Sequence, residues 1–177
     1  MIFRSVKRFL HRKDGSAAIE FAIVGPVYLA LALSSLEAGL ILTKSVILDN
    51  AMVDAAKYVY TGAANDGSIT RDDLHSFVCE RVEAIVSNCN ADLAIEVIEL
   101  STLDEEVAYS APCRDSTKEM QPVIHYSPGS GGDVMFIRAC LTTSVSVPGL
   151  GLGLALTKTD SGRFEIISST AFLNEPF

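Results

Sequence analysis

The chain has 177 residues, of which 49% are hydrophobic, and its formal net charge is −8. Residues 1–14 carry a net charge of +4, so the rest of the chain carries −12. An acidic main part without tryptophan argues against nucleic acid or anionic lipid headgroups as its partner. The roughly 130 residues that follow the amino-terminal segment are enough for one modest domain with a small core.

The chain opens with a basic leader and continues as an apolar run. The leader contains Arg4, Lys7, Arg8, Arg12 and Lys13. From Phe21 to Thr43 the only charged residue is Glu37, and a helix of that length, at about 1.5 Å per residue, reaches the thickness of a bilayer hydrocarbon core. Because Lys and Arg stay on the cytoplasmic side, we expect a cytoplasmic leader over 1–15, a transmembrane helix over 16–44 and an exported domain over 45–177.

Three interpretations of this amino-terminal segment are open. A cleavable secretory signal needs a shorter apolar run and disfavours Glu20 at its entrance. A plain uncleaved anchor explains everything except the spacing between Gly15 and Glu20. A leader removed after Gly15 explains that spacing, because the cut would leave an ammonium on Ser16 with Glu20 one helical turn further on. There the carboxylate could pair with the ammonium of a neighbouring subunit, which replaces two costly lone charges in an apolar bundle.

The residues at this boundary also resemble a known family. Residues 15–21, Gly-Ser-Ala-Ala-Ile-Glu-Phe, resemble the processing motif of the Flp/Tad branch of type IVb pilins, and the continuation to Pro26 is similar to the opening of TadE-like pseudopilins. The ending, residues 168–177, resembles the tail of the same family. The middle of the chain fits through the spacing of Cys79 and Cys89 and through the strand-like residues 135–140.

The resemblance implies a non-enzymatic minor pilin or pseudopilin subunit of a tight-adherence pilus or secretion apparatus, with Glu20 as its assembly carboxylate. Its partners would be a prepilin peptidase that cuts after Gly15, other pilin and pseudopilin subunits, and an inner-membrane assembly platform. The protein would be a single-pass protein of the bacterial inner membrane, with a cytoplasmic amino terminus and a periplasmic or extracellular domain. The alternative function is a membrane-anchored binding module whose anchor is never cleaved.

The first helix is expected to continue beyond the bilayer. Between residues 45 and 60, apolar residues recur every three or four positions, namely Leu48, Met52, Ala55 and Val59. This periodicity predicts one helix from Ser16 to about Tyr60, roughly 68 Å long, whose second half supports the domain. Pro26 is predicted to kink it. Glu37 either reaches toward the exported side or pairs with another subunit.

The remaining residues predict an α+β domain. Thr70 and Asp73 form a capping-box pattern that opens a helix ending near residues 87–88. Its apolar face is formed by Leu74, Phe77, Val78, Val82 and Ile85. Three β-rich segments follow, at 94–100, 134–147 and 164–173, and they predict an antiparallel sheet of about three strands laid on the long helix.

The four cysteines all follow the apolar run, which predicts two disulfides in an oxidising compartment. Of the three possible connectivities we favour Cys79–Cys89 and Cys113–Cys140. In one continuous helix the Cα atoms of Cys79 and Cys89 would lie about 15 Å apart, so this pairing requires the helix to end by about Ser87. A metal site is the alternative, but the cysteine spacings lack any close pair of ligands.

No constellation in the sequence indicates catalysis, a cofactor or a metal site. None of the three histidines, His11, His75 and His125, has other metal-ligating residues at the spacing that a metal site needs. The carboxylates at 72–73 and 104–106 are typical of a helix start and a solvated loop, with calcium at the latter as an alternative. Residues 149–154 have glycine at every second position, which is not the dinucleotide-binding fingerprint. This pattern predicts a flexible apolar loop, and its three leucines would be an unusual exposed group unless they form a contact patch.

Overall fold

The computed structural model describes the following residues: 15–63, 69–86, 88–100, 126–127, 129–149, 151–156, 158 and 162–174. Several features named above lie outside the described residues. They are the basic leader with His11, the carboxylates at 104–106, Cys113, His125 and the last three residues of the tail.

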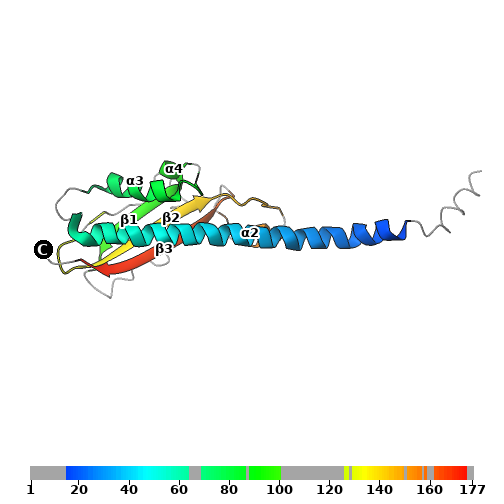
Figure 1. Ribbon diagram of the computed structural model, residues 1–177, viewed down its shortest axis with the longest axis horizontal. Coiled ribbons are helices and arrows are strands. Elements are labelled where there is room, and N and C mark those ends of the chain that lie inside the picture. Colours follow the sequence, from blue (N-terminus) through cyan, green and yellow to red (C-terminus); the bar gives the residue numbers. More distant parts are fainter. Residues whose placement is uncertain are drawn as a thin grey trace, which may run out of the picture.

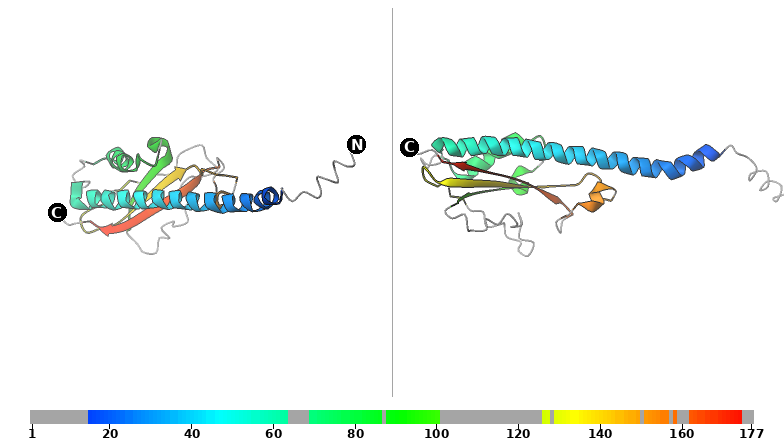
Figure 2. Two further views of the ribbon diagram at one scale, coloured as in Figure 1. Left: turned by 45° about the vertical axis from the view of Figure 1, so that its right-hand side comes forward. Right: turned by 90° about the horizontal axis from the view of Figure 1, so that it is seen from below.

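The chain forms one long helix with a small α+β domain along one half of it (Figure 1). Helix α2 runs from Ser16 to Tyr58 without interruption, and a short π-helix, η1 (Val59–Ala63), completes it. The predicted single helix is therefore confirmed. Pro26 lies inside α2, and the blue amino-terminal end of the helix turns away from the axis of the rest in the right-hand view of Figure 2.

Helix α3 (Arg71–Val82) begins at the predicted capping box. The Thr70 amide donates to Asp73 Oδ2 at 2.9 Å, and the Asp73 amide donates to the Thr70 hydroxyl at 3.3 Å. The Thr70 hydroxyl also donates to Asp73 Oδ2 at 2.6 Å, and this bond, together with the one from the Thr70 amide, holds the pKa of Asp73 below its ordinary value because both stabilise the ionised carboxylate. The reciprocal pair satisfies two backbone donors that a helix start leaves without partners.

The end of α3 differs from the sequence prediction. The helix ends at Val82 rather than near residues 87–88, and the short helix α4 (Cys89–Asp92) follows after a turn. The predicted Cys79–Cys89 disulfide is present, with Cα atoms 5.6 Å apart. The early end follows from that bond, because the chain has to double back within ten residues to bring the two sulfurs together.

The three predicted strands form one antiparallel sheet in the order β1-β2-β3. Strand β1 spans Leu93–Glu99, β2 spans Val134–Thr143 and β3 spans Phe164–Leu173. Strand β2 ends four residues before the predicted position. The reason is the register: Thr143 pairs with Phe164, the first residue of β3, so β2 has no partner strand on that side beyond this point. The predicted α+β class is confirmed.

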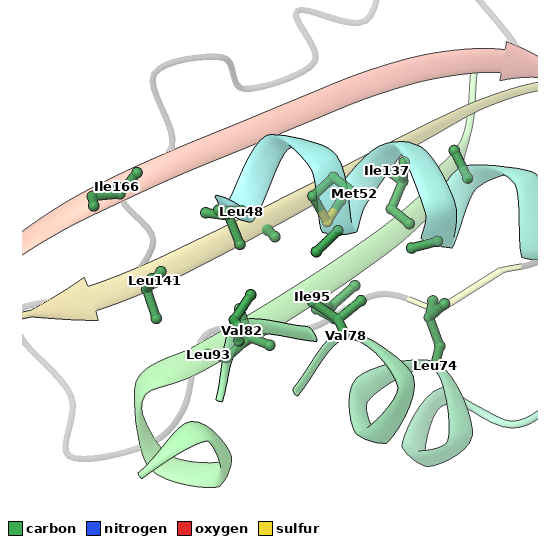
Figure 3. Close-up of a cluster of buried hydrophobic side chains, with 14 of the residues drawn as sticks. Leu48, Met52, Leu74, Val78, Val82, Leu93, Ile95, Ile137, Leu141 and Ile166 are labelled. Atoms are coloured by element: carbon green, nitrogen blue, oxygen red, sulfur yellow. The ribbon is translucent and has the colours of Figure 1, made fainter. Parts of the chain in front are cut away.

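The core lies between the sheet and the two helices (Figure 3). Register places Leu93, Leu141 and Ile166 side by side on one face of the sheet. Against this face pack fully buried side chains of α2 and α3, namely Leu48, Met52, Leu74, Val78 and Val82. The sheet thus holds the domain against one side of the carboxyl-terminal half of α2.

Candidate functional site

The amino-terminal end of α2 brings together the residues that the sequence analysis linked. Gly15 precedes the helix, and its carbonyl accepts from the Ile19 amide at 3.1 Å. The Ser16 hydroxyl donates to Glu20 Oε1 at 2.9 Å, and both residues are exposed. Ser16 and Glu20 therefore face the same side of the helix, one turn apart, as the i to i+4 spacing predicts.

The first half of α2 is apolar and is not covered by the domain. Phe21 is 73% exposed and Leu31 is 67% exposed. Other exposed apolar side chains of this half are Ile19, Ile23, Val24, Val27, Tyr28 and Leu29. The helix that these residues belong to, taken from Ser16 to Thr61, is the one helix in the described part of the chain that is long and apolar enough to cross a membrane. The described residues thus contain one candidate membrane anchor, next to Glu20.

Among the described residues, Ser34 is the first side chain of α2 that forms a hydrogen bond with the domain. The Ser34 hydroxyl donates to the carbonyl of Ala30 at 2.6 Å and accepts from the amide of Leu152 at 3.2 Å. One turn further on, Glu37 is only 3% exposed, and its Oε1 accepts from the Ser146 amide at 3.0 Å. The carboxylate of Glu37 therefore has a hydrogen-bond partner within its own chain, in a loop of the domain.

A second segment of the domain packs closely on α2 at the same level. Helix α5 spans only Leu152–Ala155 and follows Gly151, whose φ of +53° favours glycine. A Cβ at Gly151 would collide with the Ser34 side chain and lie 3.3 Å from the Ala30 carbonyl. A Cβ at Gly153 would collide with the Val147 carbonyl. Gly151 is therefore needed for the close approach of this segment to α2, and Gly153 for its approach to its own loop, whereas a Cβ at Gly149 would meet nothing within 4 Å.

His75 and the described cysteines of the domain form structural contacts. His75 Nε2 lies 3.1 Å from the Leu93 carbonyl, and its Nδ1 lies 3.6 Å from the Cys79 sulfur. Cys140 is disulfide-bonded as well, while Cys113, the partner predicted for it, lies outside the described residues. Among the residues that the structure describes, no three His, Cys, Asp or Glu side chains gather as a potential metal site.

A cavity of about 360 Å³ lies beside the carboxyl-terminal end of β2. Its charged lining residues are Lys44, Asp92 and Arg163. Arg163 Nη1 donates to Asp92 Oδ1 at 2.6 Å, which raises the pKa of the guanidinium, and Lys44 Nζ donates to the Thr143 hydroxyl at 2.7 Å. These contacts tie α2, α4 and the sheet to one another, so the charged groups that line the cavity already have partners within the protein.

A comparison with known protein families finds a match at the amino-terminal residues described above. The profile of the TadE-like protein family matches residues 15–57, which cover Gly15, Glu20 and almost all of α2. The matched range does not include residues 135–140 or 168–177. The curated proteins and the solved structures contain no match to this chain. The similarity of residues 15–57 is to a structural, pilus-related family and suggests a Tad pilus-related protein.

Sequence reasoning singled out Gly15, Ser16, Glu20 and Glu37 but not the contacts between α2 and the domain. Ser34 and Ser146 were not recognised as contact residues. The signal at Ser34 is the pair of serines that interrupts the apolar run one turn before Glu37. No local signal marks Ser146, because its contact with Glu37 joins residues 109 positions apart in the chain.

Replacing Glu37 should loosen the loop that Ser146 belongs to. The hydrogen bond to a charged acceptor contributes about 1.5–3 kcal/mol, so we expect the Ser146 amide of Glu37→Leu to exchange with deuterium at least about tenfold faster, since 1.4 kcal/mol is tenfold. Glu37→Gln is the matched control, because its amide oxygen can still accept. Equal Ser146 exchange in the wild type and both variants would show that Glu37 does not hold this loop.

Proposed function

We propose that this protein is a minor pilin-like subunit that takes part in assembling a tight-adherence pilus or secretion apparatus, held in the membrane by α2. The observation that carries the proposal is the placement of Ser16 and Glu20, with the hydroxyl and carboxylate 2.9 Å apart, at the start of an exposed apolar helix. The match of residues 15–57 to the TadE-like protein family supports it.

The first step in this function is removal of the leader. A prepilin peptidase hydrolyses the peptide bond between Gly15 and Ser16, which leaves a carboxylate on Gly15 and an ammonium on Ser16. The five basic side chains of the leader leave with it. The mature chain then begins at the first residue of α2, so its new positive charge lies one turn from Glu20.

Glu20 then acts as the assembly carboxylate. Between Glu20 and Glu37 the chain has no charged residue, so Glu20 stands at the edge of an otherwise apolar surface. A lone carboxylate in lipid is costly, and pairing with the Ser16 ammonium of an adjacent subunit lowers that cost. The same pairing fixes the axial position of one subunit relative to the next.

The proposed partners are the prepilin peptidase, other pilin and pseudopilin subunits and an inner-membrane assembly platform. The leader stays in the cytoplasm because of its positive charge, and the domain lies on the periplasmic or extracellular side. We propose no enzymatic activity. The second candidate function is a membrane-anchored binding module that keeps its leader, and the length of α2 alone fits it equally well.

Processing distinguishes these two functions. We expect the mature wild-type protein to begin at Ser16, and Gly15→Leu to retain Met1 and the whole leader because a bulky residue at the cut blocks the peptidase. Gly39→Leu is the matched control, since a Cβ at this exposed helical glycine meets nothing within 4 Å. Mass spectrometry of the amino-terminal peptide measures the outcome. A wild-type protein that still begins at Met1 would support the uncleaved anchor.

Assembly should depend on the charge at position 20. We expect Glu20→Ala to be processed like the wild type but to be absent from the sheared or detergent-resistant pilus fraction, because the Ser16 ammonium of the next subunit loses its partner. Ser35→Ala changes an exposed polar residue elsewhere on α2 and should assemble normally. Normal recovery of Glu20→Ala in that fraction contradicts the assigned role.

A further inference from the structure

The height at which the domain docks on α2 limits how much of the helix can lie in lipid. From Ser16 to Leu33 the helix is exposed on nearly all sides, and this part measures about 27 Å. A bilayer hydrocarbon core is about 30 Å thick. The span expected from composition, residues 16–44, would measure about 43 Å, which is considerably longer than the core.

The docked loops themselves cannot enter the hydrocarbon. Irregular backbone is not tolerated where lipid surrounds it, because unsatisfied amides and carbonyls cost several kcal/mol each there. Residues 144–149 and Gly151 are irregular, and the amides of Ser146 and Leu152 bond to Glu37 and Ser34. The hydrocarbon core must therefore end at or before the level of Ser34.

The segment that lies at this level is apolar. From Ser144 to Thr157 the chain has no charged residue. The right-hand view of Figure 2 shows α5, in orange, beside α2 at the end of the domain nearest to the free blue half of the helix. Leu154, in the middle of α5, is 67% exposed. An exposed leucine next to the point where a membrane helix leaves the domain gains free energy by entering the lipid interface.

We propose that residues 151–156, here called the α5 segment, rest on the outer surface of the membrane with Leu154 inserted at the boundary between headgroups and acyl chains, and that the lipid-embedded part of α2 is residues 16–33. This inference rests on the proposed anchoring by α2. The contact is apolar rather than electrostatic, in keeping with the acidic charge of the chain beyond its leader.

The contact gives the domain a second attachment to the membrane besides the helix. Gly151 is pressed against Ser34 and Ala30, so the α5 segment cannot move away from α2 without losing the Leu152–Ser34 hydrogen bond. With α2 crossing the bilayer and α5 resting on it, the domain has a fixed height and a fixed face toward the membrane. A subunit that enters a pilus would have to release this second contact.

Because the chain contains no tryptophan, a single introduced tryptophan reports its own surroundings. The experiment uses the full chain in phosphatidylethanolamine–phosphatidylglycerol vesicles, with and without lipids brominated near the top of the acyl chains. Leu154→Trp is the test variant. Phe21→Trp is the control inside the proposed span, and Val53→Trp, at a half-exposed site about 28 Å further along α2 than Ser34, is the control in water.

We expect Leu154→Trp to show blue-shifted emission and a loss of fluorescence with brominated lipid comparable to that of Phe21→Trp, while Val53→Trp is unaffected. If Leu154→Trp is not quenched but Phe21→Trp is, the surface contact of α5 is wrong and the anchor stands. Blue-shifted emission of Leu154→Trp without quenching would indicate burial against another protein copy and also overturn the inference. Absence of quenching in Phe21→Trp would overturn the anchor itself, and the proposed function with it.

Discussion

One constraint governs this molecule: a single apolar helix has to satisfy two different surroundings. The first half of α2 offers its side chains on all sides, as a helix in lipid does, whereas the second half buries one face under a sheet and a second helix. Apolar residues meet both requirements, and from Phe21 to Thr43 the only charged residue is Glu37, whereas several charged residues follow from Lys44 onward. The first polar contacts between the helix and the domain lie before that change, at Ser34 and Glu37.

Two carboxylates of α2 have opposite roles because of where they lie. Glu37 is buried and accepts a hydrogen bond from the Ser146 amide, so it helps fix the domain on the helix. Glu20 is exposed at the far end and has a hydroxyl one turn away, so its charge is available to another chain. A buried carboxylate with a hydrogen bond stabilises a fold, and an exposed one in an apolar surface is suited to recognition.

Much of the fold could be predicted from the sequence because the signals are local. The capping box at Thr70, the apolar faces of both helices and the β-rich segments act over a few residues, and the described structure contains them. Strand and helix ends were less accurate, because β2 ends where its partner strand begins and α3 ends where the Cys79–Cys89 bond turns the chain. These ends depend on contacts between distant residues.

The sequence likewise predicted the local part of the candidate site but not the part that depends on distant contacts. The spacing of Gly15 and Glu20 is visible in the sequence, and the structure places Ser16 and Glu20 together. The end of the proposed lipid-embedded segment at Ser34 was not visible, because the apolar run continues to Thr43 with Glu37 as its only charged residue. Leu42, outside the core, and Leu48, inside it, look alike until the domain is placed on the helix.

The division of α2 between lipid and domain is tested most directly by thiol labelling along its exposed face. Leu31 and Leu42 are about two-thirds exposed, and Val53 is 48% exposed. Among the described residues no native cysteine is free. Cysteine variants at these positions would be reconstituted in lipid nanodiscs and treated with a membrane-impermeant maleimide. We expect Leu42→Cys and Val53→Cys to react and Leu31→Cys to react only after the lipid is replaced by denaturant. Protection of Leu42→Cys equal to that of Leu31→Cys would contradict a lipid boundary at Ser34.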